Sequence, residues 1–173
     1  IHSYSIIGTY GTGKSSFLIN LEHDLTTDEE QNVLLKNKEI LHKGDFEILN
    51  ILGDSKSFSE ILLDKLAKKG KKEDPLALLK QYYSKLKKEG KMLFIAIDEF
   101  GKILEHAAKY NPDEELYFFQ KFTEFVNAPS RNIILISTLH QNFSAYARKL
   151  SQAQKNEWNK VKGRFQEVVF AEP

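Results

Sequence analysis

The chain has 173 residues and a formal net charge of +1, with 41% of its residues apolar and 28% charged. These values are typical of one soluble globular domain with a substantial core, and the small net charge indicates no particular class of partner. The sequence has no cysteine, which excludes disulfides and thiolate zinc sites, and it shows no apolar run or leader pattern that predicts a membrane span or a secretory signal. We therefore expect a cytoplasmic protein with no membrane partner.

A glycine-rich segment follows the first predicted strand, which spans Ser3–Ile7. Residues Gly8–Ser15 read G-T-Y-G-T-G-K-S and fit the phosphate-binding P-loop, G-x-x-x-x-G-K-[ST], at every fixed position. Apolar residues at helical spacing come next, so the sequence predicts the order of strand, loop and helix that the motif requires. These residues are Phe17, Leu18, Leu21 and Leu25.

The P-loop predicts a nucleotide site in which each residue type has a role. Its glycines let backbone N–H groups approach phosphate oxygens, and the start of the following helix adds a positive dipole end. We expect Lys14 to reach the β- and γ-phosphates and the Ser15 hydroxyl to ligate Mg²⁺. The alternative is a glycine turn that happens to end in Lys-Ser. The predicted nucleotide-binding residues are Gly8, Thr9, Tyr10, Gly11, Thr12, Gly13, Lys14, Ser15 and Ser16.

Strands and helices are predicted to alternate along the rest of the chain. Two of the apolar runs, Met92–Ile97 and Ile133–Ser137, are continuous, which is typical of strands buried on both faces of a parallel sheet. The alternation favours a three-layer α/β sandwich with right-handed crossovers. The other predicted strands are Phe46–Leu52 and Glu167–Phe170. Helices are predicted around Phe58–Leu66, Leu76–Leu86 and Leu116–Val126, over Phe143–Val161, and with a weaker pattern within Thr26–Gly44.

The strand Met92–Ile97 ends in two carboxylates, Asp98 and Glu99. Ligands of open parallel sheets bind beyond the carboxyl ends of the strands, so these residues are expected beside the P-loop. Asp98 is suited to hold Mg²⁺ through a coordinated water, and Glu99 to polarise the attacking water as a general base. The alternative is a solvated strand end.

Polar residues also follow the strand Ile133–Ser137. Thr138 is our first candidate for a contact with the γ-phosphate or the lytic water, ahead of Ser137, His140 and Gln141. The alternative for each is a residue of an ordinary strand-end turn.

Arg164 lies in the segment Val161–Phe165, directly before the last strand. An arginine at the edge of the domain could reach a neighbour's nucleotide and stabilise transition-state charge as an arginine finger. The alternative is a surface arginine at a helix C-terminus, which residue type alone favours.

Together these segments resemble the AAA+ ATPases of the P-loop NTPase superfamily. The Walker segments G-T-Y-G-T-G-K-S and I-A-I-D-E are followed in order by I-S-T-L-H-Q-N and by K-G-R-F before a final strand. The resemblance implies a five-stranded parallel sheet of order 5-1-4-3-2 and ATP hydrolysis with Mg²⁺. It also implies a homo-oligomer with sites shared between neighbours, in which Arg164 is the finger.

The sequence departs from this family at several points. The P-loop begins G-T-Y-G rather than G-P-P-G, the usual sensor Asn is not clearly placed, and no helical lid follows the last strand. The G-T-Y-G loop looks closer to the loops of signalling, DNA-handling or prokaryotic defence ATPases, and residues 139–173 are similar to large bacterial antiviral defence ATPases. Because the chain opens at Ile1 without methionine and stops directly after a strand, we expect residues 1–173 to be the core of a longer protein.

Two functions remain open at this point. The first is an ATPase module that drives conformational change, and the second is a nucleotide-gated scaffold or switch with little turnover; Glu99 favours the first. A small-molecule kinase is less favoured because no Arg-rich lid appears, and ATP is preferred to GTP because no Asn-Lys-x-Asp element appears. DNA is a further candidate partner, since residues 65–91 hold ten lysines and three acidic residues. The same lysines also fit the solvated face of two helices.

Overall fold

The computed structural model of the chain describes residues 2–27, 45–67 and 73–170. Five strands form one sheet in the order β2-β3-β4-β1-β5, and each neighbouring pair is parallel. The predicted order 5-1-4-3-2 is therefore confirmed. The strands are β1 (Ser3–Ile7), β2 (Phe46–Leu52), β3 (Met92–Asp98), β4 (Ile133–Leu139) and β5 (Gln166–Val169).

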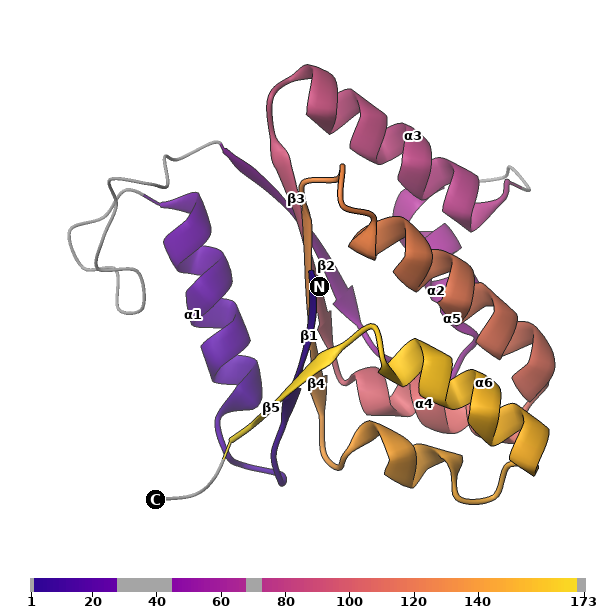
Figure 1. The fold of residues 1–173 in the computed structure, drawn as a ribbon. Coiled ribbons are helices and arrows are strands. Elements are labelled where there is room, and N and C mark those ends of the chain that lie inside the picture. Colours follow the sequence, from indigo (N-terminus) through magenta and orange to yellow (C-terminus); the bar gives the residue numbers. More distant parts are fainter. Residues whose placement is uncertain (1, 28–44, 68–72, 171–173) are drawn as a thin grey trace.

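Helices cover both faces of the sheet, as the predicted three-layer sandwich requires (Figure 1). Of the described helices, α1 (Lys14–Thr26) lies on one face. The opposite face carries α2 (Phe58–Leu66), α3 (Pro75–Lys88), α4 (Phe100–Lys109), α5 (Pro112–Asn127) and α6 (Gln152–Lys162). None of the described helices is long and apolar enough to cross a membrane.

Local sequence accounts for where several helices begin. The Ser57 side chain accepts a hydrogen bond from Glu60 N at the start of α2, and Asp74 accepts one from Leu76 N at the start of α3. Such side chains satisfy backbone donors that have no partner within the helix. Proline occupies the first turn of both α3 and α5, where its missing N–H costs nothing.

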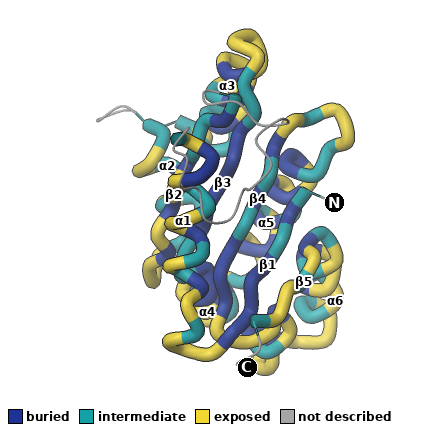
Figure 2. Tube along the Cα trace, turned by 90° about the vertical axis from the view of Figure 1, so that its left-hand side faces the viewer, coloured by how far each residue is buried: buried dark blue, intermediate teal, exposed yellow. Residues whose placement is uncertain are grey.

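The core lies mainly between the sheet and the five-helix layer. The ring of Phe58 packs against four other phenylalanine rings at centroid distances between 4.8 and 6.1 Å. On the other face of the sheet, a smaller cluster packs Leu18 and Leu25 of α1 against residues of β2 and β3. Figure 2 shows the central strands as buried, so the sheet is a rigid base for whatever its strand ends carry.

Two helix predictions need correction. The helix predicted over Phe143–Val161 is wrong as one element, because a 3-10 turn (Phe143–Ala147) and α6 are separated by a break at Ser151. Ser151 and Gln154 form a reciprocal capping box there, which starts a new helix. Helix α4 was not predicted. The helical pattern expected within Thr26–Gly44 lies outside the described residues after Thr27, and the last strand begins one residue earlier than expected.

Candidate functional site

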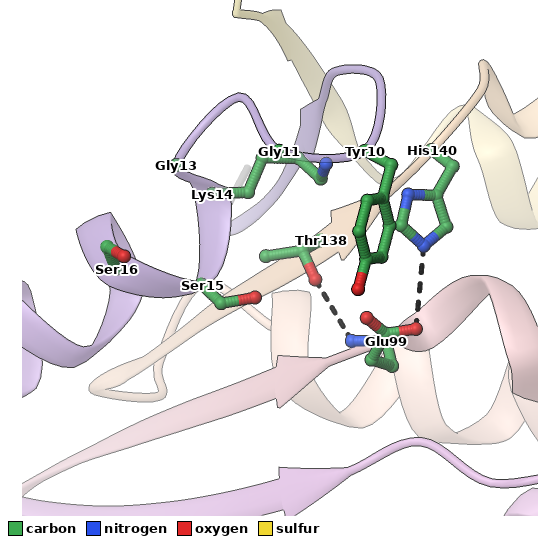
Figure 3. Close-up of a pocket in the computed structure, with 9 residues that line it drawn as sticks. All are labelled: Tyr10, Gly11, Gly13, Lys14, Ser15, Ser16, Glu99, Thr138 and His140. Carbon is green, nitrogen blue, oxygen red and sulfur yellow. Dashed lines mark hydrogen bonds and ion pairs between the residues drawn. The ribbon is translucent and has the colours of Figure 1, made fainter.

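A pocket of about 300 Å³ opens at the carboxyl ends of β1, β3 and β4. Its lining comes from three separate segments of the chain: the P-loop with the start of α1, the residue after β3, and the end of β4 (Figure 3). The lining residues are Tyr10, Gly11, Gly13, Lys14, Ser15, Ser16, Glu99, Thr138 and His140. The structure therefore brings together most of the residues that the sequence singled out.

The P-loop backbone turns sharply before α1 begins. Gly11 and Gly13 have φ angles of 83° and 85°, in the left-handed region that favours glycine. Gly13 occupies the N-cap position of α1 without a side-chain cap, and its carbonyl accepts from Phe17 N at 2.8 Å. The N-terminus of a 13-residue helix consequently faces the pocket, and such a terminus is an anion-binding element.

Lys14 is buried, with 6% of its surface exposed. Its Nζ donates to the carbonyl oxygens of Gly8 at 2.6 Å and Thr9 at 2.9 Å, and lies 3.5 Å from Thr12 Oγ1. Burial lowers the pKa of Lys14, while the negative charges of Glu99 and Asp98 act in the opposite direction. An ammonium group in this loop is thus surrounded by oxygen acceptors, the kind of partner that a phosphate also supplies.

Asp98 connects the three segments of the site. Its Oδ1 accepts hydrogen bonds from Ser15 Oγ at 3.1 Å, Thr138 Oγ1 at 2.6 Å and Glu99 N at 3.0 Å. The predicted neighbours Ser15 and Asp98 therefore lie in direct contact. One carboxylate beside one hydroxyl is a hard oxygen donor set of the kind that Mg²⁺ uses together with phosphate oxygens. The described residues include no cluster of three or more His, Cys, Asp or Glu that could hold a metal by itself.

Glu99 has an unusual backbone conformation for a non-glycine residue, with φ 57° and ψ 37°, directly before the first turn of α4. Residues of this kind are held by their surroundings and cluster at functional sites. Gly53 N donates to Asp98 O at 2.7 Å, and a Cβ at position 53 would lie 2.0 Å from Glu99 O. The end of β2 therefore braces the Asp98–Glu99 turn through a glycine that sequence reasoning missed, because no local motif marks it.

Two further side chains approach the Glu99 carboxylate. His140 Nε2 lies 3.4 Å and Lys102 Nζ 3.7 Å from its Oε2 atom. The Tyr10 ring, 88% exposed, lies beside the imidazole at a centroid distance of 5.9 Å. Figure 3 shows Tyr10, His140 and Glu99 gathered on one side of the pocket.

The other candidates at the end of β4 lie in different surroundings, and not all of them line the pocket. Thr138 lines the pocket and bridges Asp98 Oδ1 and Glu99 N. Ser137 is buried within the sheet, where its Oγ lies 3.0 Å from Ser5 Oγ, and it does not line the pocket. Gln141 lines a different cavity, against α4.

Arg164 does not lie in the pocket. Its guanidinium contacts α5 instead, with Nη2 3.2 Å from Glu124 Oε1 and Nη1 3.4 Å from Thr123 Oγ1. The side chain is 30% exposed. Among residues 2–27, 45–67 and 73–170, it forms no hydrogen bond or ion pair with a residue that lines the pocket.

Comparison with protein-family models and with curated protein sequences finds no match. Two solved structures are similar to the chain in fold. Cdc6p from Pyrobaculum aerophilum matches at 15% identity and a TM-score of 0.55, over 97% of this chain and 38% of its own. The ORC2 protein of Aeropyrum pernix, solved as ADPNP-ADP complexes, matches at 13% identity and a TM-score of 0.55, over 97% of this chain and 41% of its own.

At these identities the likeness is one of fold, and it agrees with the strand order and with the resemblance found in the sequence. The chain spans about two-fifths of the length of each solved structure.

Proposed function

We propose that the chain binds ATP with Mg²⁺ and hydrolyses it, as the ATPase module of a larger assembly. One observation carries the proposal: Lys14 and Ser15 of the P-loop meet Asp98 at the end of β3, and Glu99 directly after it, at one edge of the sheet. The similar ORC2 structure holds ADPNP and ADP, which supports the same class of ligand here.

The donor set around Ser15 and Asp98 fits the proposed metal. Ser15 Oγ and a carboxylate oxygen of Asp98 would hold Mg²⁺ together with phosphate oxygens. When bound, Mg²⁺ supplies positive charge that offsets the charge on the transferring phosphoryl group.

The protein's own groups have distinct tasks in this proposal. Lys14 and the backbone N–H groups at the start of α1 bind phosphate oxygens. Glu99 orients the attacking water and accepts its proton, since its carboxylate lies in the pocket and its backbone is fixed by Gly53 and Thr138. Thr138 holds Asp98 and the Glu99 backbone in register.

The experiment measures Mg²⁺-dependent ATP hydrolysis and ATP binding by the full-length protein, beside Lys14→Ala and Glu99→Gln. We expect Lys14→Ala to lose binding, and Glu99→Gln to keep binding while turnover falls by about 10² or more. Lys109→Ala and Glu105→Gln make the same chemical changes at exposed positions of α4 and should leave both quantities unchanged. ATP binding without turnover in the wild type would contradict the role of Glu99 and support the nucleotide-gated scaffold.

The same hydrolysis assay, run with and without duplex DNA, tests DNA as a partner. The lysines Lys80, Lys85, Lys87 and Lys88 are exposed on α3, whose apolar residues Leu79, Tyr83 and Leu86 face the core. Activation by duplex DNA that weakens steeply with salt would support phosphate contacts by these lysines. Activity that is independent of DNA and salt would assign them to the solvated face of the helix.

A further inference from the structure

The contacts of the Glu99 carboxylate converge on one of its two oxygens. His140 Nε2 lies 3.4 Å and Lys102 Nζ 3.7 Å from Oε2, and the Glu99 side chain is 23% exposed. Lys102 lies three residues along α4 and is 55% exposed, so its contribution to fixing the carboxylate is small. His140 directly follows β4, far from Glu99 in the sequence, and its side chain is 40% exposed.

His140 itself is held in place from two directions. The preceding residue, Leu139, ends β4, and its carbonyl accepts a hydrogen bond from Gly8 N at 3.1 Å, which ties the strand end to the P-loop. The imidazole lies beside the Tyr10 ring, and its Nε2 faces the Glu99 carboxylate (Figure 3). The backbone of Glu99 is independently fixed by Thr138 Oγ1 at 3.0 Å.

We propose that His140 is a positioning residue that holds Glu99 by Oε2, so that Oε1 is oriented to accept a hydrogen bond from the attacking water. The inference rests on the proposed hydrolysis. A general base must lie within hydrogen-bond reach of the proton that it takes, and the 3.4 Å contact is at the long end of hydrogen-bond distances. The contact uses the imidazole proton on Nε2 as donor.

The test compares turnover of His140→Ala and His140→Gln with that of the wild type in the full-length protein. We expect kcat of His140→Ala to fall about tenfold with KM and ATP affinity unchanged. His140→Gln keeps an N–H donor and should restore part of kcat. His23→Ala is the matched control, since His23 is 53% exposed, lies 3.8 Å from a carboxylate oxygen of Asp24, and is outside the pocket.

A double-mutant cycle separates positioning from a structural role. If His140 acts through Glu99, adding His140→Ala to Glu99→Gln should cause no further loss of kcat. Independent losses in the two backgrounds would overturn the inference. An unchanged kcat in His140→Ala, or a loss confined to ATP affinity, would also overturn it. A raised kcat would overturn it too, because His140 would then restrain Glu99.

The two proposals fail in distinguishable ways. A wild type that binds ATP without turnover overturns both. A wild type with turnover that depends on Glu99 but not on His140 overturns only the inference. Thermal unfolding of each variant checks folding. If His140→Ala does not fold, His140→Leu, which also removes the donor, takes its place under the same expectations, and a kcat of that single variant equal to that of the wild type overturns the inference.

Discussion

A single carboxylate oxygen, Asp98 Oδ1, receives hydrogen bonds from the P-loop helix, from β4 and from the residue that follows it. Three parts of the chain therefore depend on one atom for their relative position. The shortest of these bonds, at 2.6 Å, comes from Thr138, whose hydroxyl also accepts from Glu99 N. At the scale of single residues, the site depends as much on such supporting groups as on those that would touch a substrate.

Thr138 allows a direct test of this support. Thr138→Val keeps the shape of the side chain and removes both hydrogen bonds, so we expect turnover to fall by about 10- to 100-fold, and Thr138→Ser to restore most of it. Steady-state ATP hydrolysis measures the change. Equal activity in all three proteins would show that the bridge between Asp98 and Glu99 is not needed.

Gly53 is predicted to be intolerant of any side chain. A Cβ there would lie 2.0 Å from Glu99 O, so the Asp98–Glu99 turn would have to move. We expect Gly53→Ala to lower the free energy of unfolding by about 1–3 kcal/mol and to lower turnover. Gly163→Ala is the control for stability, because Gly163 has a right-handed conformation and its nearest neighbour would be 3.3 Å away. Its effect should stay within about 1 kcal/mol in the same denaturant titration.

At the scale of elements, α5 organises the helical layer. Its phenylalanines surround Phe58 of α2, and Phe58 is fully buried. The same helix carries Glu115, which is 7% exposed and accepts a hydrogen bond from Phe58 N at 3.3 Å. Helix α5 thus supplies both the apolar surface and an acceptor for a backbone donor at the start of α2.

Glu115 should make stability depend on pH. Burial raises its pKa, and the hydrogen bond from Phe58 N only partly opposes this. A carboxyl whose pKa is higher in the folded state binds more protons there, so its contribution to stability is lost as pH rises through that raised value. We expect Glu115→Gln to be more stable relative to the wild type at neutral than at acid pH.

Glu115→Ala is the matched variant for the hydrogen bond itself. It leaves the buried Phe58 N–H without its acceptor, so we expect a loss of about 1–3 kcal/mol. Denaturant unfolding at two pH values measures both variants. A difference between the Gln variant and the wild type that does not change with pH would contradict the raised pKa.

At the scale of the whole molecule, the site exists because three parallel strands end at the same edge. Strand β4 lies between β3 and β1, with Ile97 paired to Ser137 and Ile6 to Thr138. That register carries Thr138 between Asp98 and the P-loop. Reversing one of these strands would move its end to the opposite edge of the sheet, and a different order of parallel strands would separate Asp98 from the P-loop.

Arg164 lies outside the pocket, and its guanidinium donates a hydrogen bond to Glu124 of α5. If sites are shared in an oligomer, Arg164→Ala should keep ATP binding and lower turnover by on the order of 10³. Mixing it with Lys14→Ala should restore part of the activity, since a mixed pair contains one complete site. Arg148→Ala, at an exposed position, is the control. No recovery on mixing, together with turnover independent of protein concentration, would assign Arg164 a structural role.

The resemblance to AAA+ ATPases implied the strand order, which the structure confirms. The sequence by itself determined the P-loop, since Gly8–Ser15 is contiguous and strand, loop and helix follow one another along the chain. It also indicated Asp98 and Glu99, because two carboxylates after a continuous apolar strand form a local pattern. It did not determine the break at Ser151, where the capping box overrides the apolar spacing.

Tertiary structure alone decided which groups surround these residues. Gly53, His140 and Thr138 reach the Asp98–Glu99 turn from the carboxyl ends of two other strands, β2 and β4. Their contacts depend on strand order, register and the left-handed conformation of Glu99. These are cooperative properties of the packed sheet, and no single segment of the sequence specifies them.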